Sequence, residues 1–191
     1  MTRSATVLLL GLGVLGWLQP ASAQPWNASP PSVRPLAPGT TPPAARLARA
    51  AERVTDLRAI ALRLVNRDRQ RQGLPSLSEN ALLNQVAQRH AEDMIQRNYF
   101  SHYSPEGQTP TDRVHQAGGR IVVGENILNY RLGTFRPRRA DLVPQFQQLF
   151  MGSPQHKRII LKSGFESFGY GFAVTPDGSR IVAVQMFGTS P

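Results

Sequence analysis

The amino-acid sequence predicts an α+β domain, because the helical patterns come first along the chain and the strand patterns come last. From about residue 46 to residue 152, apolar side chains recur at helical spacing. Residues 168–174 and 181–187 are instead rich in aromatic and β-branched side chains. The segment 175–179 between them, Thr-Pro-Asp-Gly-Ser, is typical of a tight turn, so the two runs predict a β-hairpin.

Length and composition fit one ordinary domain with an appendage. The chain has 191 residues, of which 40% are hydrophobic, and it has no cysteine. The lack of cysteine excludes zinc ribbons, thiol nucleophiles, disulfide frameworks and lipid anchors linked through cysteine. The formal net charge of +10 comes mostly from arginine and favours an anionic partner.

The N-terminus has the pattern of a secretory signal peptide over residues 1–23. Arg3 gives a positive start, Thr6–Leu18 is a largely apolar run, and Ala21-Ser22-Ala23 supplies small residues for cleavage after Ala23. An uncleaved anchor is the alternative, but the run is shorter than the ~20 residues that span a bilayer. The expected protein is therefore secreted or periplasmic, with no transmembrane anchor after cleavage and no nucleic-acid partner.

Residues 24–45 are rich in proline and predict a disordered linker, which leaves residues 46–191 as the folded domain. Two amphipathic helices open this domain. The first stops before Gly73 and Pro75, and its arginines between residues 58 and 71 are expected on its solvent-exposed face. The second follows Ser76 or Ser78 as its N-cap and ends near Asn98. The two apolar stripes consist of Leu57, Ile60, Ala61, Leu64 and Val65, and of Leu83, Val86, Ala87, His90, Ala91, Met94 and Ile95. Because His90 lies on the second stripe, it is expected to be a packed, hydrogen-bonded side chain.

The middle of the domain has weaker patterns. Thr109 and Pro110 predict the start of a short third helix, which ends before the glycines at 118 and 119. Residues 121–123 predict a brief strand that leads into the segment 124–127. Residues 129–139 predict a polar, basic loop, and apolar residues from Leu142 to Phe150 predict a fourth helix that ends near residue 153.

Three short segments hold most of the unusual polar residues: 99–102, 124–127 and 153–156. Each lies where a periodic element meets a turn, and binding side chains are usually displayed at such places. Their spacing alone does not show that His102, Glu125 and His156 meet in the fold. Asn126 has a simpler interpretation as a residue that ties loops together through hydrogen bonds.

Many short motifs, in order, resemble bacterial members of the CAP superfamily, the SCP-like group of cysteine-rich secretory proteins, antigen 5 and plant pathogenesis-related proteins. The resemblance covers about residues 55–188. Its motifs are Leu64-Val65-Asn66 with Arg69, Gly73-Leu74-Pro75, Ala87, His90-Ala91, Met94, Phe100-Ser101-His102, Gly124-Glu125-Asn126-Ile127, His156 with Ile160-Leu161, Gly169-Tyr170-Gly171 and Gln185-Met186-Phe187.

The resemblance implies an α-β-α sandwich with a small, mostly antiparallel sheet flanked by helices, and a cleft lined by two histidines and two acids. His102, Glu125 and His156 match three of these four positions, with Asn126 and Ser101 beside them. Where relatives have a second Glu, this chain has Ser153-Pro154-Gln155. No cofactor is predicted with certainty, but His102 and His156 suit a divalent metal such as zinc.

The sequence thus predicts a monomeric binding module that acts outside the cytoplasm through this cleft. The ligand that the resemblance implies is a lipid or sterol, while the excess of arginine points to an anionic component of the cell envelope. The alternative is a hydrolase that depends on a metal or on a serine such as Ser101 or Ser104. No catalytic residue is assigned.

Overall fold

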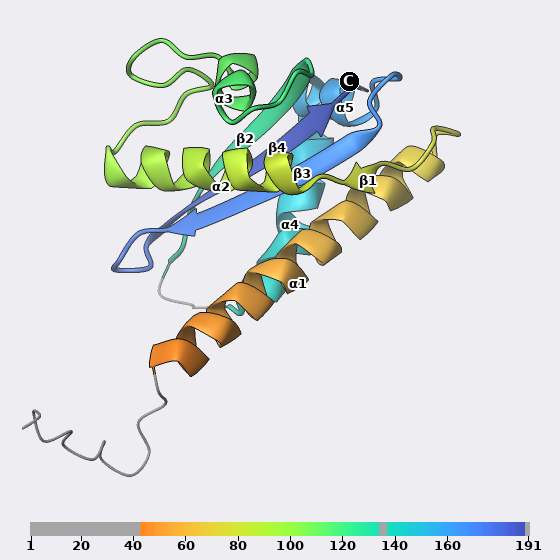
Figure 1. Cartoon of the computed structure of the whole chain (residues 1–191). Coiled ribbons are helices and arrows are strands. Elements are labelled where there is room, and N and C mark those ends of the chain that lie inside the picture. The colour runs from red at the N-terminus through yellow and green to blue at the C-terminus, as the bar shows by residue number, and fades with distance from the viewer. Residues whose placement is uncertain (1–42, 134–136, 190–191) are drawn as a thin grey trace, which may run out of the picture. The chain divides into compact units, whose positions relative to one another are not determined.

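The computed structural model describes residues 43–133 and 137–189, which form an α-β-α sandwich (Figure 1). The signal peptide and nearly all of the predicted linker lie outside these residues. In chain order the elements are α1 (Pro43–Gln70), β1 (Ser78–Glu79), α2 (Ala81–Gln96), α3 (Pro110–Gln116), β2 (Val123–Arg131), α4 (Arg139–Gly152), α5 (Pro154–Ile160), β3 (Ser167–Val174) and β4 (Arg180–Gly188).

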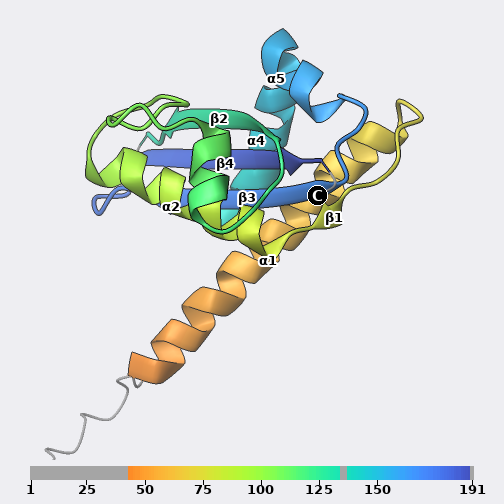
Figure 2. The same ribbon diagram turned by 45° about the horizontal axis from the view of Figure 1, so that its top comes forward.

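The four-stranded sheet has the order β1-β3-β4-β2. The short strand β1 is parallel to β3, whereas β3 and β2 are both antiparallel to β4. Helices α2 and α3 cover one face, and α1 and α4 cover the other (Figures 1 and 2). The α+β class, the sandwich and the mostly antiparallel sheet predicted from the sequence are confirmed.

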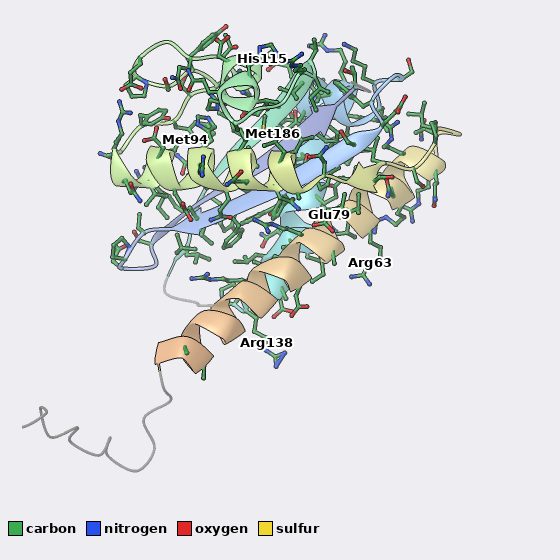
Figure 3. The ribbon with its side chains drawn as sticks, in the orientation of Figure 1. Arg63, Glu79, Met94, His115, Arg138 and Met186 are labelled. Atoms are coloured by element: carbon green, nitrogen blue, oxygen red, sulfur yellow. The ribbon has the colours of Figure 1, made fainter. Side chains whose placement is uncertain are left out.

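Each face of the sheet has its own apolar core. Along β4, Ile181, Ala183 and Phe187 pack toward α1 and α4. The alternate residues Val182, Val184 and Met186 pack toward α2 and α3, where Figure 3 labels Met186 and Met94. Because successive strand residues point to opposite faces and both faces are covered, β4 is a nearly continuous apolar run.

Two glycines of β3 let α2 pack directly on the sheet. A Cβ at Gly169 would lie 2.3 Å from the carbonyl carbon of Leu83, and one at Gly171 would lie 2.2 Å from the carbonyl oxygen of Ala87. These distances are far below van der Waals contact with backbone atoms that cannot move independently. The backbone of α2 is therefore as close to β3 as glycine permits.

This close approach also protects the free edge of β3. The amide of Tyr170 donates to Oδ1 of Asn84 (2.8 Å), and the amide of Phe172 donates to Oε1 of Gln88 (3.1 Å). Gln88 Nε2 donates back to the carbonyl of Phe172 (3.1 Å), and Arg58 Nε donates to that of Tyr170 (3.3 Å). Asn84 and Gln88 are four residues apart, which is a rise of about 6 Å along α2. Tyr170 and Phe172 are two residues apart, which is ~6.6 Å along β3. The two spacings nearly agree, so side chains one helical turn apart can reach alternate backbone amides of the strand. They take the place of a further strand at this edge.

The predicted element boundaries differ from the structure in the middle of the domain. The N-cap of α2 is Asn80, whose side chain accepts from the amide of Leu83, and not Ser76 or Ser78. Strand β2 begins at Val123 and continues to Arg131, so the predicted strand at 121–123 was misplaced and the predicted loop starts too early. Helix α5 was not predicted, and α1 begins at Pro43, inside the predicted linker. The prediction of a short helix after Thr109 is confirmed, and the structure adds a capping box between Thr109 and Asp112.

The prediction that the arginines of α1 face solvent is wrong for Arg69, which is fully buried. Its guanidinium donates to the carbonyls of Pro75 (3.0 Å), Ile160 (2.8 Å) and Lys162 (3.0 Å). It therefore supplies donors to carbonyls at the end of α5 that have no partner within the helix. Of the helices in the described part of the chain, none is long and apolar enough to cross a membrane.

Candidate functional site

The candidate site lies along β2, an edge strand of the sheet. Glu125 pairs in register with Met186 of β4, and Asn126 pairs with Gln185. Because neighbouring strand residues point to opposite faces, Glu125 points toward α2 and α3, and Asn126 points toward α4 and α5. Helices α3 and α5 both contact β2, and Figure 2 shows α5 beyond this edge of the sheet.

His102 and Glu125 are in direct contact, as the sequence suggested but did not establish. His102 Nδ1 is 2.9 Å from Glu125 Oε1. The Glu125 side chain is only 1% exposed, whereas the His102 side chain is 45% exposed. Because a carboxylate only accepts hydrogen bonds, Nδ1 is the protonated nitrogen of a neutral His102, and Nε2 is then left as an acceptor. Nε2 has no partner in the described part of the chain.

Arg113 holds the second oxygen of Glu125, and sequence reasoning missed this residue. Its Nη2 is 2.6 Å from Glu125 Oε2, and its Nη1 donates to the carbonyls of His102 (2.9 Å) and Gln108 (3.1 Å). A seven-residue helix is too short to show a periodic pattern, so Arg113 resembles any solvent-exposed arginine in the sequence. The available signal was indirect, since a buried carboxylate needs a nearby cation.

His90 completes the buried surroundings of Glu125. Its Nε2 lies 3.1 Å from the carbonyl oxygen of Ser101 and 3.8 Å from Glu125 Oε1. Burial is the main cause that lowers the pKa of His90, and the attraction of Glu125 opposes it. A neutral ring that donates from Nε2 to Ser101 fits these distances. The prediction of a packed, hydrogen-bonded His90 is confirmed.

The two candidate nucleophiles have structural partners. Ser101 Oγ accepts from the amide of Tyr103 (3.0 Å). Ser104 Oγ accepts from the amides of Glu106 (3.3 Å) and Gln108 (3.2 Å). In the described residues neither hydroxyl is paired with an imidazole nitrogen, which is the contact that would activate a serine.

Asn126 lies in a buried chain of carboxamides. Its Nδ2 donates to the carbonyl of His156 (3.2 Å) and to Gln185 Oε1 (3.2 Å). Gln185 Nε2 then donates to Gln147 Oε1 (2.8 Å), and Gln147 Nε2 donates to Asp68 Oδ2 (2.9 Å). Asn126 is fully buried, so it positions the backbone of His156, as the simpler interpretation of the sequence suggested. Gln147 and Gln185 were not singled out in the sequence.

His156 approaches the edge of β2 from α5 and is half-buried. Its ring packs edge-on against Phe150, with the ring centroids 5.3 Å apart. Burial and, secondarily, the charge of His102 lower the pKa of His156. The two histidines approach β2 from opposite faces of the sheet, since His102 contacts Glu125 and His156 lies at Asn126.

The described residues do not fit the zinc site that the resemblance suggested. No group of three or more histidine, cysteine, aspartate or glutamate side chains in that part of the chain could hold a metal ion. Both oxygens of Glu125 and Nδ1 of His102 are already engaged. One nitrogen of His102 and the ring of His156 are too few ligands for a tetrahedral site.

Comparisons with known proteins agree with this fold. The family described as "CAP: Cysteine-rich secretory protein family" matches residues 62–187. The uncharacterized protein YkwD of Bacillus subtilis (strain 168) is 32% identical over 110 residues, which are 57% of this chain and 39% of that protein. The chain therefore spans well under half the length of this curated relative.

Two solved structures are similar. An extracellular protein containing an SCP domain from Bacillus anthracis str. Ames has a TM-score of 0.57 at 28% identity, covering 70% of this chain and 40% of that one. An outer surface protein from Borrelia burgdorferi has a TM-score of 0.56 at 19% identity, covering 66% of this chain and 87% of that one. The first supports the assignment of an SCP domain, and the second shows the fold alone.

Proposed function

Because the chain belongs to the cysteine-rich secretory protein (CAP) family, we propose that it is a binding module that acts outside the cytoplasm through the surface around His102, Glu125 and His156. The location is supported by the description of the Bacillus anthracis structure, which is 28% identical, as an extracellular protein. It is also supported by the signal pattern of residues 1–23.

One observation carries the proposal: His102 is partly exposed but is held in a fixed orientation. Glu125 accepts its Nδ1–H, and Arg113 holds both Glu125 and the backbone carbonyl of His102. Nε2 is thereby prepared to accept a hydrogen bond from a ligand hydroxyl or amide. Preorganisation of this kind reduces the entropy that binding must overcome.

The surroundings of His102 favour an amphipathic ligand. Phe100 and Tyr103, in the same loop, are 44% and 58% exposed. Large exposed apolar side chains beside a fixed polar group suit a molecule with an apolar part and a hydrogen-bonding head. The net charge of +10 favours an anionic head group. A lipid of the cell envelope combines these features.

The test is binding of fluorescent phosphatidylglycerol to the wild-type protein and to His102→Ala, with His115→Ala as the control. His115 lies exposed on α3 (Figure 3), so its replacement should leave binding unchanged. Loss of one hydrogen bond should weaken binding by roughly three- to tenfold in His102→Ala. Equal affinity of wild type and His102→Ala, or no binding by the wild type, would remove the proposal. A parallel titration with an uncharged fluorescent sterol shows whether the charge of the lipid head group contributes to the affinity.

A further inference from the structure

A cavity of about 510 Å³ lies between α2, α3 and the loop that joins them, and the proposed function does not use it. Its wall includes His90 and Arg113, which contact Glu125 from this side, but not His102, Glu125 or His156 themselves. Figures 1 and 2 show the joining loop and α3 on the same side of the sheet as α2. The volume is within the range of about 300–1,000 Å³ that is typical of small-molecule sites.

The wall is polar almost throughout. Val86 and Ala117 are its only apolar residues, and it contains no phenylalanine, tyrosine or tryptophan. A lipid chain or a sterol would cover polar groups that have no partner of their own, such as Arg89, which is costly. A sugar would lack an aromatic ring on which to pack. The composition therefore favours a hydrophilic ligand rich in hydrogen-bonding groups.

Part of the wall is fixed before any ligand arrives. Arg97 donates through two nitrogens to the carboxylate of Glu106, at 3.1 and 2.5 Å, and its Nη1 lies 3.6 Å from Asp93. Tyr99 donates to the other oxygen of Asp93 (2.5 Å). Arg97 balances one of the two carboxylate charges and the hydroxyl of Tyr99 satisfies Asp93, so this cluster shapes the cavity and leaves a small excess of negative charge.

Other groups on the wall remain available. Arg89 and Glu92 lie three residues apart on α2, yet no ion pair joins them in the described part of the chain. Glu92 uses one oxygen to accept from Gln88 (2.8 Å), and in the described part of the chain Arg89 and Gln96 form no side-chain hydrogen bond or ion pair. Arg113 Nε is buried without a partner in the described part. Arg89, one oxygen of Glu92 and the carboxamide of Gln96 thus have no hydrogen-bond partner among the described residues of this cavity.

We propose that this cavity binds a short zwitterionic peptide, with its carboxylate at Arg89 and its ammonium group at Glu92. The carboxamide of Gln96 on the wall can exchange hydrogen bonds with peptide groups, whereas those of Gln108 and Gln116 bond to each other (3.1 Å) and offer only their remaining donors and acceptors. Opposite charges one helical turn apart recognise both ends of such a ligand, which a purely anionic or neutral molecule does not offer. This site is separate from the surface around His102.

The test is an NMR titration of the isotopically labelled protein with tri-alanine and with the same peptide capped at both ends. Saturable shifts are expected for residues of α2, α3 and the joining loop with free tri-alanine only. Arg89→Gln and Glu92→Gln should each weaken binding at least about tenfold, because each removes a charge-assisted hydrogen bond. Arg63→Gln is the matched control, since Arg63 is exposed on α1 (Figure 3).

Three results would overturn the proposal: no saturable shifts with tri-alanine, equal binding of the capped peptide, or unchanged affinity in both α2 variants. The position of the NMR shifts also shows which cavity binds the peptide, because Arg89 borders a second cavity lined by Arg58 and Gln85. Shifts confined to that side would assign the ligand elsewhere. None of these outcomes affects the lipid titration, since His102 is not in the cavity wall.

Discussion

Replacing Arg113 with methionine should destabilise the fold severely, because the variant leaves Glu125 without its cation. The two side chains are 10% and 1% exposed, so solvent screens their interaction little. Removing one partner of a buried ion pair typically costs about 3–5 kcal/mol, because the other charge stays buried and uncompensated. Arg113 also loses its hydrogen bonds to the carbonyls of His102 and Gln108. We therefore expect a loss of about 3–5 kcal/mol in the free energy of unfolding.

Urea unfolding of a double-mutant cycle measures this interaction directly. If the cost comes from the uncompensated charge, Glu125→Gln should recover much of the stability that Arg113→Met loses. The coupling energy between the two positions should then reach at least about 2 kcal/mol. Arg120→Met, at an exposed position, is the control and should change stability by less than about 0.5 kcal/mol. A coupling energy below about 0.5 kcal/mol would refute the reasoning.

Three further predictions concern the sheet, the histidines and the buried amides. Gly171→Ala should lose about 3 kcal/mol or more in urea unfolding, because its Cβ would overlap the backbone of α2, whereas Gly152→Ala has open space and should be nearly neutral. Burial lowers the pKa values of His90 and His156, so the free energy of unfolding should fall as the pH drops below the ordinary histidine pKa of 6.5. The urea midpoint of His90→Gln should therefore depend less on pH than that of the wild type. An equal pH dependence of the two proteins would contradict this prediction. Gln185→Leu should cost about 1–3 kcal/mol, because Gln147 Oε1 loses its donor, and unchanged thermal stability would argue against a buried amide chain.

The sign of the pH effect follows from which state binds more protons. A histidine whose pKa is lowered in the folded state is protonated earlier in the unfolded chain, so acid favours unfolding. The stabilisation is complete above the unfolded pKa and decreases as the pH falls from there toward the folded pKa. Arg113 adds to the lowering of the His90 pKa, whereas Glu125, the hydrogen bond to the carbonyl of Ser101 and Asp93 oppose it.

The long elements of the fold could be predicted because their apolar patterns extend over several turns or strand residues. The stripe of α2 and the two strands of the hairpin are examples. Short elements could not be predicted in the same way. Helix α5 has seven residues and β1 has two, so neither shows a period, and both depend on tertiary contacts such as those of Arg69 with the end of α5. Strand β2 was placed wrongly because polar residues in its middle hide its alternation.

Some residues of the candidate site could be predicted from the sequence, and others could not. His102, Glu125 and His156 could be identified because their residue types and flanking motifs resemble a known family. Arg113 and Gln185 could not, because an arginine in a polar helix and a glutamine in a strand have many ordinary roles. Their partners are chosen only when the chain folds, since Arg113 meets Glu125 across the α3–β2 packing and Gln185 meets Gln147 across the β4–α4 packing.

Glu125 shows why folding and binding must be tested at different residues of this site. It is buried between His90 of α2, His102 of the following loop and Arg113 of α3. A buried carboxylate without these three groups would be strongly unfavourable, so the same contacts that orient His102 also hold the loop against the sheet. A variant at Glu125 therefore changes stability and ligand affinity together. Of the three partners of Glu125, His102 alone is substantially exposed, so His102→Ala should lose the least stability, and a loss of binding measured at a temperature where this variant is still folded would separate the two roles.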